Sequence, residues 1–325
     1  MPRPLGRRPA DRLTRTASTT LAVLLGIVSI ALAPYASRAQ SPADTVRVSL
    51  PFTREFMIRS AINGREYQVA VAIPPDYIAG IRDTARYNVL YVLDGNDEFP
   101  LAVQAHRLRR IGQLGAEWPD IIIVGIGYRA SRFAETLALR NEDYTPTVAA
   151  PYPECLAFGR LPRGGGPAFL RVLREEIIPF VDARYRTTND RGIMGHSLGG
   201  LFAFNALFES PPLFQRYAAL SPSLHFDRDI MARIEAKFAR EHQVLKARLF
   251  VAMSDHEIDC LSNSTQRMLD SLRVRRYVGL TFESHVFPDE SHMSVVPVAI
   301  GRSLQALGYD PPPPKPSPAP PSRRP

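Results

Sequence analysis

A serine in a glycine-rich turn is the first candidate for chemistry in this chain. Residues 191–204 read RGIMGHSLGGLFAF, and Ser197 is the serine of a Gly-x-Ser-x-Gly pattern. In hydrolases this pattern makes a tight turn between a strand and a helix, and the turn projects the hydroxyl as a nucleophile. The pattern arises by chance in roughly one chain in ten of this size. A strand-like run before Ser197 and a helical apolar pattern after it favour the catalytic interpretation.

A nucleophilic serine needs a base to take its proton, and a histidine is the usual base. In the chain order of many hydrolases, the base comes last, in a loop after the final strand. His292 meets this condition, because it follows the strand-like residues 280–287 and precedes a helix pattern. His285 lies inside that strand, and His225 and His242 fit surface positions. We therefore predict that His292 is the base.

The acid that would orient the base is expected after the preceding strand, residues 247–253. In many hydrolases the acid lies three positions beyond a small residue that ends this strand, which selects Glu257 and leaves Asp255 as the alternative. The carboxylate would hold the imidazole and stabilise its cation. Solvated loop charges, or a metal bound by His256 with its acidic neighbours and Cys260, are the other interpretations. No known metal-ligand spacing is present, so we predict no metal and no cofactor.

Two backbone N–H groups must hold the negative charge that develops on the attacked carbonyl oxygen. One belongs to the residue after the nucleophile, which is Leu198. The other comes from the loop after an early strand. Residues 91–99 (YVLDGNDEF) supply such a loop, in which Gly95 allows a close approach. We predict the Asn96 N–H as the second donor.

The segments around these residues alternate between strand-like and helix-like patterns. Alternating stretches and the turn signal Asn63-Gly64 predict an antiparallel start to a sheet; the stretches are residues 46–50, 56–60 and 67–74. Unbroken apolar runs, typical of parallel strands covered on both faces, follow at residues 87–94, 120–128, 191–195, 216–222, 247–253 and 280–287. Helical patterns such as 168–185 and 264–276 lie between them. The chain is therefore predicted to be α/β, with a mostly parallel central sheet, antiparallel N-terminal strands and helices on both faces.

Residues 1–39 have the layout of a secretory signal peptide. A basic start, an apolar core at residues 21–32 and small residues at Ser37 and Ala39 precede the expected cleavage site. The apolar core is shorter than the about 20 residues that span a bilayer, so a membrane anchor is disfavoured. We expect a periplasmic or secreted protein with no stable membrane span after cleavage. Six Arg and one Asp give this leader a net charge of +5 out of the formal +8 of the whole chain, so the charge does not indicate a nucleic-acid partner.

The composition also divides the rest of the chain. Residues 311–325 (PPPPKPSPAPPSRRP) predict a disordered tail, and residues 40–310 are enough for a single α/β domain. The segment 131–166 is too long for a plain connection, and loops of such length are usually functional. The two cysteines, Cys155 and Cys260, can form one disulfide or remain separate thiols.

Seven segments, in this order along the chain, resemble the esterase D-like, enterochelin-esterase-like branch of the α/β-hydrolases. They lie within residues 88–297 and read VLYVLDGNDEF, IIIVGIGYR, RNEDYTPT, GGGPAFLRVLREEIIPFVDARYRT, RGIMGHSLGGLFAFNALF, AALSPSL and FPDESHMSVVP. The resemblance implies an α/β-hydrolase (esterase) domain that hydrolyses carboxylic esters without a cofactor. It also implies small-molecule ester substrates, among them catecholate siderophores such as enterobactin.

The same resemblance assigns roles to individual residues. Ser197 matches the nucleophile, His292 the base, and Asn96 and Leu198 the positions whose N–H groups form the oxyanion hole. Arg140, which opens RNEDYTPT, matches a position near the cleft.

Two of these assignments carry alternatives. Arg140 would meet an anionic substrate or order the loop, or it would be a surface arginine paired with Glu142. Relatives often have glycine at the position of Ser254, and some siderophore esterases work with a serine–histidine pair alone, so the role of Glu257 stays open.

These observations together predict an exported serine hydrolase that cleaves carboxylic esters, of siderophore type, through an acyl-enzyme. The sequence leaves three alternatives open. They are a carbohydrate-linked acetyl or feruloyl esterase, an acyltransferase, and a non-catalytic binding module that keeps the fold.

Overall fold

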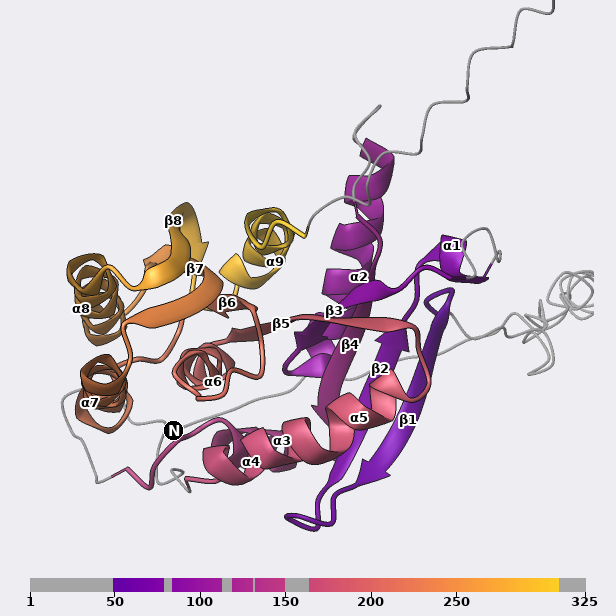
Figure 1. Cartoon of the computed structure of the whole chain (residues 1–325), viewed down its shortest axis with the longest axis horizontal. Coiled ribbons are helices and arrows are strands. Elements are labelled where there is room, and N and C mark those ends of the chain that lie inside the picture. Colours follow the sequence, from indigo (N-terminus) through magenta and orange to yellow (C-terminus); the bar gives the residue numbers. More distant parts are fainter. Residues whose placement is uncertain (1–48, 79–83, 113–118, 131, 150–163, 310–325) are drawn as a thin grey trace, which may run out of the picture. The chain divides into compact units, whose positions relative to one another are not determined.

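A mixed sheet lies at the centre of the structure (Figure 1). The computed structural model describes residues 49–78, 84–112, 119–130, 132–149 and 164–309. Within them the sheet has eight strands in the order β1-β2-β4-β3-β5-β6-β7-β8. The strands are β1 (Thr53–Arg59), β2 (Glu66–Ala72), β3 (Tyr87–Val92), β4 (Ile121–Tyr128), β5 (Thr187–His196), β6 (Arg216–Leu220), β7 (Val244–His256) and β8 (Val278–Ser291).

The strand directions agree with the hydrophobic patterns: the N-terminal strands are antiparallel, and the strands with unbroken apolar runs are parallel. From β4 through β3, β5, β6, β7 and β8 the pairings are parallel, and β2 pairs antiparallel with both β1 and β4. Every residue of β4 is buried, as expected for a strand covered on both faces. The predicted fold class is therefore confirmed. The first predicted strand is wrong in the described part, because residues 49–50 lie outside any strand and the next residue, Pro51, has no N–H for a ladder.

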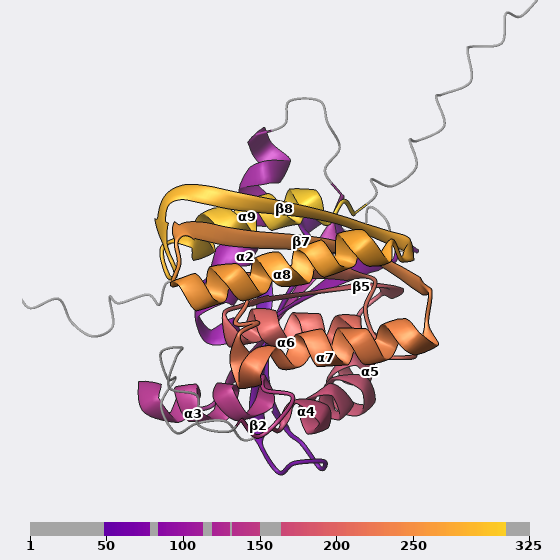
Figure 2. The same cartoon turned by 90° about the vertical axis from the view of Figure 1, so that its left-hand side faces the viewer.

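Helices cover both faces of the sheet, as Figures 1 and 2 show. Helices α2 (Gly95–Gly112) and α9 (Val295–Ala306) pack on one face. The other face carries α4 (Gly166–Val172), α5 (Ile178–Asp182), α6 (Leu198–Leu207), α7 (Phe226–Glu241) and α8 (Asp259–Arg275). Two further helices are α1 (Pro75–Ile78) and α3 (Phe133–Asp143), and α3 contacts α4 and α6.

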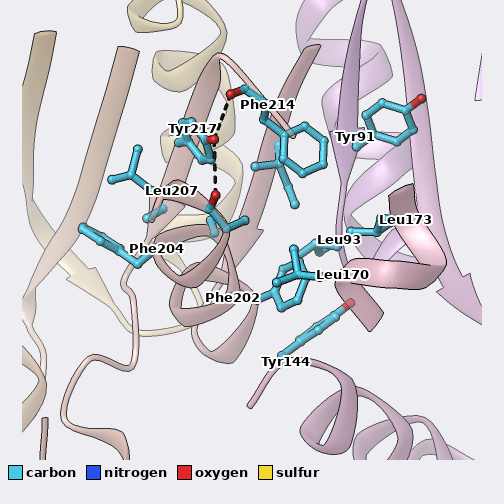
Figure 3. Packing of buried hydrophobic residues seen from close by; sticks show 14 of the residues in the cluster. Tyr91, Leu93, Tyr144, Leu170, Leu173, Phe202, Phe204, Leu207, Phe214 and Tyr217 are labelled. Atoms are coloured by element: carbon cyan, nitrogen blue, oxygen red, sulfur yellow. Dashed lines mark hydrogen bonds between the residues drawn. The ribbon is translucent and has the colours of Figure 1, made fainter. Parts of the chain in front are cut away.

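The side chains of β3 and of Leu93, the residue that follows it, divide between the two cores. Leu90 and Val92 point to the face of α2 and α9, and Tyr91 and Leu93 point to the face of α6. Figure 3 shows this second core, to which Leu93 and Phe202 of α6 both belong. This packing fixes α6, the helix that begins directly after Ser197.

The helical pattern at residues 168–185 forms one continuous helical stretch with a wide turn in its middle. The π-helical segment η3 (Leu173–Ile177) joins α4 to α5. Pro179 follows directly within α5, and proline cannot donate to the helical ladder. A single wide turn is a common adjustment within α-helices.

Some predictions fall outside the described residues, namely the leader (1–39), the proline-rich tail (311–325) and Cys155. Cys260 lies near the start of α8 and is disulfide-bonded. Among the described residues, no helix combines the length and the apolar character that a membrane span requires.

Candidate active site

Ser197 lies in the turn between β5 and α6. Its backbone has φ 58° and ψ −116°, a conformation that residues with a side chain rarely adopt and that is typical of a nucleophile elbow. Gly195 makes the turn possible, because a Cβ at that position would lie 2.6 Å from the Gly199 carbonyl group. The strand, turn and helix expected around Ser197 are therefore present.

His292 lies between Ser197 and Glu257. Its Nε2 is 3.0 Å from Ser197 Oγ, and its Nδ1 is 2.8 Å from Glu257 Oε2. The sheet explains this arrangement, because β7 and β8 pair in parallel with His256 opposite Ser291. The residues that follow, Glu257 and His292, therefore leave the sheet side by side. The three residues predicted as nucleophile, base and acid form one hydrogen-bonded chain.

The Glu257 side chain is only 1% exposed. Burial raises its pKa, but the contact with His292 and the neighbouring hydroxyls of Ser221 and Ser254 outweigh burial and lower the pKa below its usual value. Glu257 is therefore a carboxylate at neutral pH, and a carboxylate only accepts hydrogen bonds. The proton of the neutral imidazole must then sit on Nδ1, which leaves Nε2 to accept the Ser197 hydroxyl.

His196 contacts His292, the predicted base, although nothing in the position of His196 before Ser197 indicated this. Its Nε2 lies 2.7 Å from the His292 carbonyl oxygen, so that nitrogen carries a proton and donates it. The two rings are 4.7 Å apart between centroids. Burial and the nearby His292 lower the pKa of His196 to about 4. The ring is therefore neutral at pH 7 and adds no charge beside the base.

The two predicted oxyanion donors stand at the first turns of α6 and α2. β3 and β5 are paired neighbours, and the Leu93 N–H donates to the Met194 carbonyl at 2.9 Å, so the loop after β3 lies beside the elbow. The first N–H groups of a helix have no partner inside the helix. Across the described residues, neither the Leu198 nor the Asn96 N–H has a hydrogen-bond partner. Both are thus available to a carbonyl oxygen bound at Ser197.

The Asn96 side chain fastens this loop to the neighbouring strands. Its Oδ1 accepts the Tyr128 N–H at 2.8 Å, and its Nδ2 donates to Gln68 Oε1 at 2.9 Å. Gly127 leaves room for the amide, since a Cβ there would lie 2.3 Å from Asn96 Oδ1. The loop is therefore held by β2 and β4 as well as by the end of β3.

Arg140 lies beneath the same loop, and it is nearly buried. Its Nε and Nη2 donate to the two carboxylate oxygens of Asp94 at 2.8 and 2.9 Å, and Nη2 also lies 3.3 Å from the His196 carbonyl oxygen. Burial lowers the pKa of Arg140, but the Asp94 charge outweighs burial and raises it overall. Glu142 pairs instead with Arg65. Of the roles expected for Arg140, this geometry favours ordering the loop, and the surface pair with Glu142 is wrong.

Two other expectations change around the site. His225 is buried rather than on the surface, because the segment after β6 folds back beside the elbow, and burial lowers its pKa. Asp255, the alternative acid, is exposed and accepts the Asp289 N–H at 3.0 Å. With His256 these two carboxylates form an exposed group whose ligand atoms lie within 4.8 Å of one another, an ordinary arrangement on an acidic surface.

The serine hydroxyls that surround Ser197, His292 and Glu257 were not predicted from the sequence. Ser223 Oγ lies 3.2 Å from Ser197 Oγ, and Ser221 and Ser254 stand near Glu257. Ser221 and Ser223 belong to AALSPSL, which begins in β6, the strand next to β5 in the sheet, and continues beyond its end. That adjacency is the signal that could have pointed to them.

The fold and the site together define an α/β-hydrolase with a serine, a histidine and a glutamate in hydrogen-bonded sequence at the carboxyl ends of its strands. The sequence profile of the esterase family, described as "Putative esterase", matches residues 60–260. The chain belongs to this esterase family.

Individual relatives agree with this classification. Ferri-bacillibactin esterase BesA of Bacillus subtilis (strain 168) is 30% identical over 270 residues, which are 79% of this chain and 90% of that protein. An IroE-like serine hydrolase from Shewanella oneidensis superposes with a TM-score of 0.68 at 25% identity, over 78% of this chain and 79% of the other. The BES protein from Bacillus cereus shares the fold with a TM-score of 0.71 at 23% identity, over 83% of this chain and 100% of the other. The family expected from the sequence is confirmed.

Proposed function

We propose that this protein is an exported serine hydrolase that cleaves the carboxylic esters of a siderophore through an acyl-enzyme. The observation that carries the proposal is the hydrogen-bonded chain from Ser197 through His292 to Glu257, with distances of 3.0 and 2.8 Å. Membership of the esterase family supports ester hydrolysis as the reaction.

Each residue has a defined part in the proposed acylation step. Ser197 Oγ attacks the ester carbonyl carbon while its proton moves to His292 Nε2. The Glu257 carboxylate stabilises the imidazolium, and the N–H groups of Asn96 and Leu198 hold the oxygen that becomes negative. The C–O bond to the alcohol then breaks, and the alcohol leaves with the proton from His292. Water repeats the sequence on the acyl-enzyme and releases the acid.

The substrate and the location rest on different observations. BesA is by name an esterase of ferri-bacillibactin, which supports a siderophore ester as substrate. Export rests on the leader pattern of residues 1–39. Expression of the full chain in a bacterium, followed by fractionation and N-terminal sequencing, tests export. Cleavage before Gln40 is the expected result, and an uncleaved cytoplasmic product would contradict it.

The experiment for the reaction compares three purified proteins, which are the mature chain, Ser197→Ala and Ser303→Ala. Ser303 is a matched control, because it is a fully buried serine whose hydroxyl bonds the Ile300 carbonyl on the opposite face of the sheet. Turnover of enterobactin is expected to fall by roughly 10³-fold or more in Ser197→Ala and to stay near the parent rate in the control. An unchanged rate in Ser197→Ala would refute the nucleophile.

A substrate panel separates the proposed substrate from others. Preferential turnover of acetylated or feruloylated sugars over enterobactin would move the proposal to a carbohydrate-linked ester. Failure of a fluorophosphonate probe to label Ser197 would instead indicate a binding module that does not catalyse.

A further inference from the structure

A second serine, Ser223, touches the nucleophile. Its Oγ lies 3.2 Å from Ser197 Oγ, and its N–H donates to the Ser197 carbonyl oxygen at 3.0 Å. Parallel pairing of β5 with β6 places His196 opposite Leu220, so the chain after β6 passes beside the elbow. Ser223 is fully buried. The backbone hydrogen bond between the two residues and the pairing of β5 with β6 therefore hold the Ser223 hydroxyl next to Ser197 Oγ.

Counting protons fixes the direction of the contact between the two hydroxyls. Glu257 is a carboxylate and accepts from His292 Nδ1, so in the neutral form of the imidazole, which is the form that can act as a base, His292 Nε2 has no proton and accepts from Ser197. A hydroxyl has one proton to donate and two lone pairs to accept with. The Ser197 hydroxyl donates its single proton to His292 Nε2, so Ser223 must be the donor in the contact between the two hydroxyls. Within the described part of the chain, Ser197 Oγ is the only hydrogen-bond partner of the Ser223 hydroxyl.

We propose that Ser223 is a catalytic residue that donates its hydroxyl proton as a hydrogen bond to Ser197 Oγ and assists the release of that oxygen from the acyl-enzyme. This inference rests on the proposed function, because it takes Ser197 as the nucleophile. The donor acts at Ser197 Oγ, the atom that bonds to the acyl carbon, and it is distinct from the two N–H groups that face the carbonyl oxygen of the substrate.

The hydrogen bond favours one half of the reaction over the other. During acylation it withdraws electron density from the attacking Ser197 oxygen, and it also stabilises that oxygen as its proton leaves, so the two effects oppose each other. In the acyl-enzyme the oxygen belongs to an ester and is a weak acceptor. When the ester breaks, the oxygen gains negative charge and becomes a strong acceptor. A bond that strengthens only toward the transition state accelerates the step.

The atoms of the deacylation step balance without any further reactant. Water attacks the acyl carbon and gives a proton to His292 Nε2. The bond from the acyl carbon to Ser197 Oγ breaks, and its electron pair goes to Oγ. The proton on His292 Nε2 then moves to Oγ and restores the hydroxyl. Ser223 keeps its own proton throughout and donates only a hydrogen bond.

Rapid-mixing kinetics with a p-nitrophenyl ester test this role. The burst of p-nitrophenolate reports acylation, and the steady state that follows reports deacylation. The proteins are the mature parent, Ser223→Ala, Ser223→Cys and the buried control Ser303→Ala. The thiol of Ser223→Cys fills nearly the same space but is a weak donor. This variant supplies the measurement if Ser223→Ala does not fold.

Loss of the donor is expected to slow deacylation by roughly 10-fold or more, the value of a hydrogen bond to a charged group. Acylation should change less, so the acyl-enzyme accumulates and is visible by intact mass. The control should match the parent. Deacylation at the parent rate in both Ser223 variants, or equal losses in the two steps, would overturn the inference while leaving the proposed function intact. A parent protein that neither turns over the ester nor labels at Ser197 would overturn both.

Discussion

Replacing Arg140 with leucine is expected to reduce the free energy of unfolding by about 3–5 kcal/mol, because it leaves a buried carboxylate without its cation. The side chains of Arg140 and Asp94 are 13% and 14% exposed, so water screens the pair little. The change removes two hydrogen bonds to Asp94 and a third to the His196 carbonyl. Folded domains are typically stable by about 5–15 kcal/mol, so this loss is a large share of the total.

A double variant isolates the charge from the lost packing. Asp94 has a positive φ of 48°, which asparagine tolerates well, so Asp94→Asn removes the charge without straining the backbone. Asp94→Asn combined with Arg140→Leu is expected to recover about 1–3 kcal/mol relative to Arg140→Leu alone. Urea unfolding of the four proteins at pH 7 gives the complete cycle. A loss below about 1 kcal/mol in Arg140→Leu, the level of a surface pair, or strict additivity of the single changes, would refute a buried pair.

Three further predictions concern the elbow, the base and its support. Glu257→Gln is expected to lower kcat by roughly 10²- to 10⁴-fold, because an amide no longer selects the reactive tautomer of His292; ester turnover measures this, and a melting temperature close to that of the parent excludes unfolding as the cause. Gly195→Ala should cost about 1–3 kcal/mol, because the new Cβ meets the Gly199 carbonyl group, and an unchanged urea midpoint would contradict this. The third change acts through pH. The pKa of His196 is about 4 in the folded protein and its ordinary value is 6.5, so below pH 6.5 the unfolded chain takes up the proton first and stability is lost as the pH falls toward 4. His196→Gln lacks this proton, so the stability advantage of the parent over the variant should shrink by about 2–3 kcal/mol between pH 6.5 and 4.5, and an advantage that does not change with pH would count against a buried neutral ring.

The closeness of Ser197, His292 and Glu257 could be predicted because sequence order and strand order are linked. A strand followed by Gly-x-Ser-x-Gly fixes the elbow locally. Successive parallel strands then bring the ends of β7 and β8 to one edge of the sheet, where Glu257 and His292 follow them. These predictions needed only the strand assignments, and not the packing of side chains.

The partners of Arg140 and Ser197 could not be predicted in the same way. Glu142 is two residues after Arg140 on α3, and residues two apart on a helix do not face each other, so helix geometry alone argues against that pair. Selecting Asp94 instead requires the position of α3 relative to β3, which no pattern encodes. The contact between the Ser223 hydroxyl and Ser197 could not be predicted either, because a small polar residue after a strand is as common in a plain turn as in a reactive site.

The separation of the site residues along the chain has a consequence for the order of synthesis. Ser197 and its hydrogen-bond partner His292 are 95 residues apart. A ribosome that has completed the elbow has still to make α6, β6, α7, β7, α8 and β8 before His292 exists. The hydrogen bond between Ser197 and His292 can therefore form in the nascent protein only after all eight strands of the described sheet have been translated, and its formation reports that the last strand has paired.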